Sequence, residues 1–455
     1  MPTLRVINPA IENASRQELL DLQERRLVAQ VLRAYQCVPY YRNRLPKEAA
    51  TISSLAEFRA IIPFQSKADL LVAQGNLLTE QVARPGSQVV SMHMTSGTTG
   101  LGQEVHPLTK LDVEAMGSTW VYQAHWAGLR LGDSIFYTFP VGMQTGGLSS
   151  FPMAERMSSL FFQTGIYATE KKVDYLLSYK PNALIVSPAY LTRLQAIFEE
   201  RKLNPREVLP NFKAIFIAGE SYSEDWARRS IDFWGANISE WYGLMQGGQN
   251  LCFSCESGIL PNGERGHLHA MEHRALVEVL HPGTNDPVEP GEEGELVATT
   301  LFREAFPILR FRTGDRVRLM PPCSCGRPMM SIQAGTVARY DDMMKIRGQN
   351  LWPDAVDKIV FALGDIEEYA GLVYVDGSGR ETVEVSVEFN ASTPLDDHQR
   401  AQRIAAISTE INQKLNVRMD VREVPYLTLP RFEFKTRRWS DERRAGRDFV
   451  RYQRT

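Results

Sequence analysis

The chain has 455 residues, more than one compact core usually holds, so two or three domains are expected. Its 51 Lys+Arg and 54 Asp+Glu give a net charge of -3, which does not favour nucleic acid or an anionic membrane as principal partner. No apolar run reaches the about eighteen residues that a membrane span needs, and the start of the chain lacks the pattern of a secretion signal. A cytoplasmic protein is expected.

The first elements along the chain are a helix and a polar loop. Apolar residues within 19–32 recur with helical spacing and predict an amphipathic helix. Further on, hydroxyls and glycines alternate just after an apolar, strand-like segment. Backbone N–H groups can approach an anion closely in such a run, and the hydroxyls add donors, so it can wrap polyphosphate. The run lacks the Gly-Lys-Ser/Thr ending of the common phosphate loop, and an exposed polar turn is the alternative. The residues of this run are Thr95, Ser96, Gly97, Thr98, Thr99 and Gly100.

Short apolar runs then alternate with helical patterns up to about residue 218. The runs at 135–137, 183–186 and 214–217 are typical of strand–helix–strand units around a largely parallel sheet. Ligands of such sheets lie beyond the carboxyl ends of the strands. The polar loop, Gly219-Glu220 and Tyr242-Gly243 all follow strand-like runs, so a shared site is predicted there.

The pattern changes twice in the second half of the chain. Short alternating strands divided by Pro/Gly turns predict a small antiparallel or barrel-like subdomain at about 276–330. Beyond residue 340 the order is strand, helix, two hairpin strands, long helix and strand, which predicts a small α+β domain. The expected fold is therefore α/β, with a large domain at 1–340 and a small domain at 341–455. The predicted elements of the small domain are strands at 343–346, 370–375 and 382–389, helices at 354–363 and 398–415, and a strand through Val421.

Seven motifs in this order resemble those of the adenylate-forming enzymes, the superfamily of acyl-CoA synthetases, peptide-synthetase adenylation domains and luciferases. The resemblance runs from about residue 20 to 440, and it is strongest to the phenylacetate–coenzyme A ligases. Segments at 145–148, 299–301, 323–327 and 350–353 favour that branch. Seven ordered matches carry far more weight than any single one. The motifs lie at 95–100, 218–220, 242–244, 310–315, 339–343, 347–350 and 430–435.

The resemblance implies a catalytic and a nucleotide-binding set. Lys435 is the implied catalytic cation, which bridges the substrate carboxylate and the α-phosphate. Asp315 is the implied ribose ligand, since a carboxylate accepts hydrogen bonds from both vicinal hydroxyls. Tyr242 is expected to lie against adenine, and a buried core tyrosine is the alternative. The remaining nucleotide residues are the loop 95–100, Gly219, Glu220 and Gly243. Arg327 and Arg339 are expected to hold the nucleotide or the interdomain geometry, and a surface ion pair is the alternative for each.

The resemblance also implies moving parts, cofactors and partners. Asp341 is the implied hinge about which the small domain first presents the lysine and then a thiol channel. The implied cofactors are ATP, Mg²⁺ and coenzyme A, and the implied partner is a small carboxylic acid. A carrier protein as acceptor and a homodimer are left open, whereas nucleic acid and membrane are not expected.

The cysteines suggest a metal. Five cysteines, an odd number, argue against a disulfide framework. The resemblance implies a closed, structural zinc site of Cys255, His269, Cys323 and Cys325, with Cys252 as a substitute for Cys255. Cysteines buried as small hydrophobes are the alternative.

Two positions depart from the family pattern. Gln246 stands where a glutamate usually helps to hold magnesium, and a neutral amide is expected to be only a weak magnesium contact. Leu101 replaces the lysine that usually ends the phosphate loop. These two lost charges leave three alternatives open: a slower ligase, an altered nucleophile, or a fold kept for another purpose.

The implied acid pocket is also unusual. Gln144 offers an amide where the relatives are apolar, so a polar aryl acid such as a hydroxy- or aminobenzoate is expected. The leading hypothesis is an ATP-dependent aryl-acid–CoA ligase. One alternative is an adenylating enzyme that serves a carrier protein or an amine, or that activates another oxyanion such as nitrite; the second is a non-catalytic nucleotide-binding module. The pocket residues are Tyr137, Phe139, Gly142, Gln144, Gly146, Ala218 and Met245.

Overall fold

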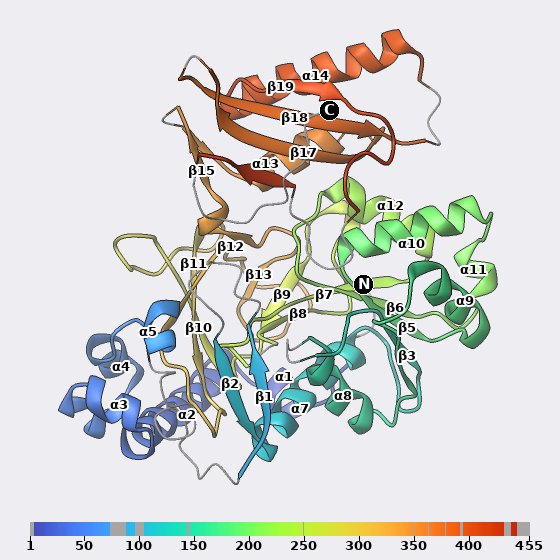
Figure 1. Ribbon diagram of the computed structural model, residues 1–455. Helices are drawn as coiled ribbons and strands as arrows, with labels where there is room; N and C mark the ends of the chain where they lie inside the picture. The colour runs from blue at the N-terminus through green and yellow to red at the C-terminus, as the bar shows by residue number, and fades with distance from the viewer. Residues whose placement is uncertain are drawn as a thin grey trace.

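The structure is a computed structural model in which the chain forms a large α/β part and a small α+β domain (Figure 1). The predicted α/β class is confirmed. Within the described residues, no helix is both long and apolar enough to span a membrane. The described residues are 4–72, 88–95, 104–142, 146–248, 250–347, 349–362, 364–377, 379–391, 395–431 and 438–443.

Short helices surround one long amphipathic helix at the start of the chain. Helix α2 (Arg16–Cys37) begins at Ser15, whose side chain forms a capping box with Glu18. It is the helix predicted at 19–32. Its buried face includes Leu27 and Val31, which share a core with residues of the later antiparallel sheet. The other elements here are α1 (Pro9–Glu12), α3 (Pro39–Arg44), η1 (Lys47–Thr51), α4 (Leu55–Ile61) and α5 (Lys67–Val72).

The largest described sheet has the strand order β13-β9-β8-β7-β6-β5-β3-β4. Strands β4, β3, β5, β6 and β7 are parallel, whereas β8, β9 and β13 continue the sheet antiparallel. The parallel part was predicted, and the antiparallel extension was not. The strands are β3 (Ile135–Tyr137), β4 (Phe161–Gln163), β5 (Ala183–Val186), β6 (Ala214–Ile217), β7 (Asn237–Tyr242), β8 (Cys252–Ser254), β9 (His267–Ala270) and β13 (Ser331–Gln333).

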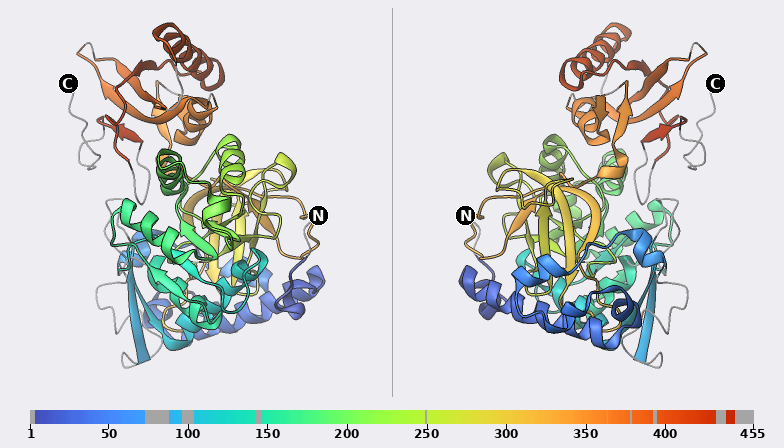
Figure 2. Two further views of the ribbon diagram at one scale, coloured as in Figure 1. Left: turned by 90° about the vertical axis from the view of Figure 1, so that its right-hand side faces the viewer. Right: turned by 90° about the vertical axis from the view of Figure 1, so that its left-hand side faces the viewer.

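Helices cover both faces of the parallel part, which is why its strands are continuous apolar runs. In β5, Leu184 and Val186 face a core shared with α9, α10 and α12, while Ile185 faces the core under α7 and α8. Figures 1 and 2 show these two layers. The helices are α7 (Lys110–Trp126), α8 (Gly146–Arg156), α9 (Thr169–Tyr179), α10 (Pro188–Glu200), α11 (Pro205–Val208), α12 (Glu224–Trp234) and η4 (Pro261–Gly263).

Two antiparallel units adjoin this sheet. Strands β1 (Val89–Met94) and β2 (Val105–Thr109) form a two-stranded sheet, and β2 leads directly into α7. The second unit has the order β10-β11-β12-β14, in the region where a small antiparallel subdomain was expected. Its strands are β10 (Ala275–Leu280), β11 (Glu293–Thr300), β12 (Phe311–Arg318) and β14 (Ala338–Arg339).

The small domain has a separate core, formed by residues from Met344 to Met419. Its main sheet has the order β19-β18-β17-β20, with β17 and β18 antiparallel. Figure 2 shows this domain standing beyond one end of the large part. Strands β16 and β20 were not predicted. The elements are β15 (Met344–Ile346), β16 (Gln349–Leu351), α13 (Pro353–Phe361), β17 (Ile366–Val375), β18 (Glu381–Phe389), α14 (Asp397–Leu415), β19 (Asp420–Glu423) and β20 (Trp439–Asp441).

A short 3-10 helix, η5 (Tyr340–Asp342), links β14 of the large part to β15 of the small domain. Asp341, the predicted hinge, belongs to this helix. The predicted boundary therefore falls on the connection between the two sheets. Its role as a pivot remains a prediction.

Candidate nucleotide site at the carboxyl edge of the central sheet

Strands β6 and β7 are parallel neighbours, so the loops that follow them lie at the same edge of the sheet. Gly219 follows β6 with φ +92°, and among the described residues other than its chain neighbours no atom lies within 4 Å of the place where a Cβ would stand. The backbone there is open to a ligand. Glu220 accepts a hydrogen bond from the backbone N–H of Ala189 at 3.1 Å, at the start of α10. Gly243 follows β7 and is exposed.

Three of the predicted nucleotide residues lie together beside these loops. The hydroxyl of Tyr242, at the end of β7, donates to Asp315 Oδ2 at 2.5 Å. Arg339 Nη1, from β14, donates to Asp315 Oδ1 at 3.0 Å and to the carbonyl of Thr313 at 2.7 Å. Burial and the charge of Asp315 raise the pKa of Tyr242, so its hydroxyl stays protonated. Three distant segments thus place a donor, an acceptor and a cation in one cluster.

The predicted phosphate loop, 95–100, lies between the described residues Thr95 and Glu104. The backbone N–H of Thr95 donates to the carbonyl of Glu104 at 2.9 Å. The backbone N–H of Glu104 donates in turn to Thr95 Oγ1 at 2.9 Å. These two residues form the neck of the loop. Ser96, Gly97, Thr98, Thr99 and Gly100 lie outside the described residues, as do Leu101 and the catalytic candidate Lys435.

Glu104 is a charged residue that the sequence patterns did not indicate. Its buried carboxylate accepts hydrogen bonds from the side-chain amide of Gln246 and from His106 Nε2, the latter at 3.1 Å. Lys67 Nζ lies 3.8 Å from its Oε1. One feature of the sequence could have indicated it. An acidic residue follows the glycine- and hydroxyl-rich run, whereas an anion-binding loop is expected to carry positive charge.

The predicted acid-pocket residues that the structure describes lie in or after strands β3, β6 and β7 or at the start of α8. Tyr137 is buried at the end of β3, and its ring contacts that of Phe139 with centroids 5.6 Å apart. Met245 is buried and its carbonyl accepts from Arg303 at 3.1 Å. Gln144 lies outside the described residues. The other three candidates are Ala218, which is half-buried after β6, Gly142, which is exposed, and Gly146, which begins α8.

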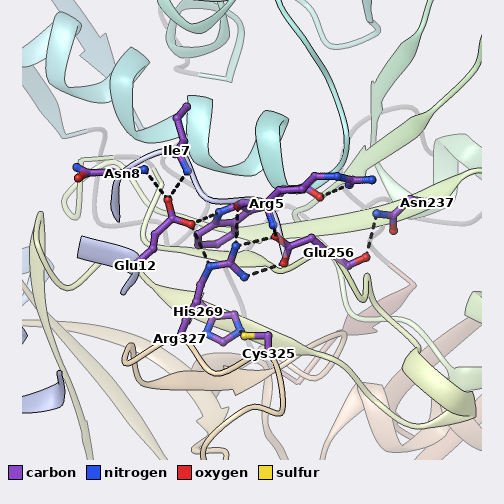
Figure 3. Close-up of polar contacts among 10 residues, drawn as sticks. Arg5, Ile7, Asn8, Glu12, Asn237, Glu256, His269, Cys325 and Arg327 are labelled. Atoms are coloured by element: carbon purple, nitrogen blue, oxygen red, sulfur yellow. Dashed lines mark hydrogen bonds and ion pairs between the residues drawn. The ribbon is translucent and has the colours of Figure 1, made fainter. Parts of the chain in front are cut away.

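Arg327 lies in a buried ion-pair network of the large part, and its predicted role in holding the nucleotide or the interdomain geometry stays a prediction (Figure 3). Its guanidinium is fully buried, with Nε 3.1 Å from Glu12 and Nη1 2.7 Å from Glu256. It also lies over the ring of Trp126 at 4.1 Å and donates to the carbonyl of Arg5 at 2.9 Å. Four of its five N–H donors are thus committed to Glu12, Glu256 and the carbonyl of Arg5, so in this structure the side chain holds the large part together.

Four predicted metal ligands meet next to this network. The ligand atoms of Cys255, His269, Cys323 and Cys325 all lie within 4.8 Å of one another. Cys325 Sγ lies 3.5 Å from His269 Nε2, the contact drawn in Figure 3. Cys252, the predicted substitute, is buried in β8 and is not part of this group. Three thiols and one imidazole are a donor set typical of structural zinc.

The fold and the clustered groups define a class: an α/β nucleotide-binding enzyme with a small C-terminal domain. Residues 11–300 match the family described as AMP-binding enzyme, and residues 348–443 match the AMP-binding enzyme C-terminal domain. The chain belongs to the AMP-binding enzyme family. The predicted adenylate-forming class and its phenylacetate–CoA ligase-like branch are confirmed.

The relatives agree over nearly the whole chain. A phenylacetate–coenzyme A ligase of Pseudomonas putida is 30% identical over 97% of this chain and 98% of its own length. That of Escherichia coli is 28% identical over 95% of this chain and 97% of its own length. The solved 2-hydroxyisobutyryl-CoA ligase in its postadenylation state has a TM-score of 0.84 at 23% identity, covering 96% of this chain and 92% of that one. The chain is thus an AMP-forming acid–thiol ligase in class.

Proposed function

We propose that this protein activates a small carboxylic acid with ATP, releases pyrophosphate, and transfers the acyl group from acyl-AMP to coenzyme A. The observation that carries this proposal is the Tyr242–Asp315–Arg339 cluster at the carboxyl edge of the sheet. In the proposed complex, Asp315 accepts hydrogen bonds from both ribose hydroxyls, because a carboxylate has acceptor sites for two donors. Arg339 orients this carboxylate, and Tyr242 lies against the base.

The first half-reaction brings a carboxylate against the α-phosphate, so cations and donors are needed where negative charge accumulates. Lys435 is the proposed bridge between the two reacting anions. The loop at 95–100 is proposed to hold the departing pyrophosphate through backbone N–H groups and hydroxyls. Mg²⁺, when bound, would neutralise phosphate charge.

For the second half-reaction we propose that the small domain turns about Asp341. Residues at the ends of elements commonly absorb such backbone changes, and Asp341 lies in the short helix between the two sheets. The TM-score to the postadenylation form of 2-hydroxyisobutyryl-CoA ligase is 0.84, and that to its thioesterification form is 0.68. The higher TM-score to the postadenylation form supports a position of the small domain nearer to the one in that form.

The proposed acid is a polar-substituted aryl acid. The aromatic pair of Tyr137 in β3 and Phe139 just after it, and the four relatives named phenylacetate–coenzyme A ligase, support an aryl group. The amide of Gln144 is the proposed partner of its polar substituent.

The test is a screen of aryl and aliphatic acids for ATP consumption, with the adenylate identified by mass spectrometry. We expect hydroxy- or aminobenzoates to exceed phenylacetate, and Gln144→Leu to reverse that order by about tenfold, since one lost polar contact changes selectivity on that scale. Preference for aliphatic acids in the parent chain would contradict the aryl proposal. Supplying coenzyme A, a carrier protein or an amine separately distinguishes the acceptors, and nitrite is included among the oxyanions. Nucleotide binding without pyrophosphate release for every acid would favour a non-catalytic module.

We further propose that Cys255, His269, Cys323 and Cys325 bind a structural zinc ion. Their donor atoms are close enough for one tetrahedral ion, with bonds of about 2.3 Å to sulfur and about 2.0 Å to nitrogen. A complete set of four protein ligands leaves no open position, so the site would stabilise the fold rather than take part in the chemistry.

Removal of this metal is expected to destabilise the large part. Purified chain should contain about one zinc ion, and chelation should lower the melting temperature by at least about 5 °C, since metal affinity adds directly to folding free energy. Cys325→Ser should lose the zinc, whereas Cys252→Ser, a matched change in a cysteine outside the group, should keep it. A chain purified from zinc-supplemented cells without the metal would rule the site out.

A further inference from the structure

Glu104 follows the predicted phosphate loop by four residues, and backbone contacts with Thr95 fix where it lies. The reciprocal hydrogen bonds between Thr95 and Glu104, both 2.9 Å, close the neck of the loop. Glu104 is therefore held one residue before β2 and directly opposite the residue with which the loop begins. Its side chain leaves the neck toward Gln246, in the segment that follows β7.

The carboxylate of Glu104 has an unusual environment for a buried charge. Its side chain is 2% exposed, and one oxygen, Oε2, accepts from Gln246 and His106. The other oxygen, Oε1, accepts no hydrogen bond from any residue that the structure describes. Lys67 balances the charge from 3.8 Å, which is beyond hydrogen-bond distance. A buried acceptor without a donor destabilises the fold unless something else binds it.

The neighbours of Glu104 leave that oxygen available to a cation. His106 Nε2 contacts the other oxygen, Oε2, at 3.1 Å and not Oε1. Gln246 contributes an amide that orients the carboxylate and adds no charge. Carboxylate oxygens are the side-chain ligands that Mg²⁺ prefers, together with phosphate oxygens and water.

We propose that Glu104 supplies the protein carboxylate for the divalent cation that accompanies ATP, in place of the glutamate that is missing at position 246. The proposal rests on the proposed function, because it assigns a residue to the nucleotide site of that reaction. Gln246 is then a positioning residue that holds Oε2 and leaves Oε1 directed at the metal. In this proposal Glu104, whose side chain contacts Gln246, supplies the negative charge that is missing at position 246.

The test measures metal binding without turnover. Full-length chain is saturated with α,β-methylene-ATP, which cannot transfer its adenylyl group because a methylene replaces the oxygen between the α- and β-phosphates. Mn²⁺ binding is then followed by electron paramagnetic resonance. Glu104→Gln is expected to weaken Mn²⁺ binding about ten- to hundredfold, the range that loss of one supporting interaction typically causes. Nucleotide affinity in the presence of EDTA should change by less than about twofold, since this carboxylate touches the metal rather than the nucleotide.

Two further variants sharpen the result. The double variant Glu104→Gln with Gln246→Glu returns a carboxylate to the neighbouring position and should recover most of the Mn²⁺ affinity. Glu278→Gln is the matched control: Glu278 is equally buried, also has an oxygen without a hydrogen bond among the described residues, and pairs with Arg59 away from the loop neck. It should bind Mn²⁺ as the parent does.

Mn²⁺ affinity in Glu104→Gln within about twofold of the parent, with an unchanged circular dichroism spectrum, would overturn the proposal, since a lost metal ligand costs more than that. Should Glu104→Gln not fold, the double variant carries the test, and weak Mn²⁺ binding by a folded double variant would overturn the proposal equally. Because no acid is present, the result is separate from acid activation. If the parent chain activates aryl acids but Glu104→Gln binds Mn²⁺ normally, the role of Glu104 is refuted and the proposed function stands.

Discussion

Lys435→Ala is expected to lower acid-dependent ATP–pyrophosphate exchange by about a hundred- to a thousandfold, the loss typical of removing one group that stabilises transition-state charge. The reason is electrostatic. A carboxylate attacking an α-phosphate joins two anions, and the proposed role of Lys435 is to lie between them. Lys435 lies outside the described residues, so this expectation follows from the motif at 430–435 and from the chemistry.

The second half-reaction provides an internal comparison. Synthetic acyl-AMP and coenzyme A supplied to Lys435→Ala should give thioester at close to the parent rate, because that step no longer joins the two anions. Lys414→Ala serves as a control, since Lys414 is an exposed lysine on α14 that pairs with Glu410. If Lys435→Ala kept more than about a tenth of the parent exchange rate, the lysine would have no place in the proposed mechanism. Removing one group that stabilises transition-state charge lowers the rate by more than that.

Arg327→Ala is expected to lower the free energy of unfolding by about 3–5 kcal/mol, the cost of leaving buried charges without their partner. Arg327 is fully buried between Glu12 and Glu256 and lies over Trp126. The change leaves two buried carboxylates uncompensated and opens a cavity beside the ring. Because Glu12 and the backbone of Arg5 are both held by this guanidinium, the N-terminal segment should also exchange amide hydrogens faster.

Chemical denaturation and hydrogen exchange measure these two effects. Arg228→Ala is the control, because its ion pair with Asp225 is exposed on α12 and should contribute less than about 1 kcal/mol. The triple variant Arg327→Met, Glu12→Gln and Glu256→Gln should be more stable than Arg327→Ala, because it has no unpaired buried charge. An unfolding free energy of Arg327→Ala within about 1 kcal/mol of the parent would mean that the network does not hold the large part together.

Features that local patterns encode were predictable from the sequence. The amphipathic helix and the continuous apolar strands have periods that any window of the chain reveals, because each residue's face depends on its near neighbours. The family motifs are equally local. They led to Tyr242, Asp315 and Arg339, which the structure brings together. The four zinc candidates were found in the same way and lie together.

What only the tertiary structure decided is which distant residues become partners. The family resemblance implied that Arg327 holds the nucleotide or the interdomain geometry, but only the fold shows that it forms a buried ion pair with Glu12, 315 positions away. Glu104 and Gln246 are 142 positions apart, and neither is informative alone. The physical reason is that the energy of a buried charge depends on whatever the fold packs against it, and side-chain periodicity along one segment carries no record of that neighbour.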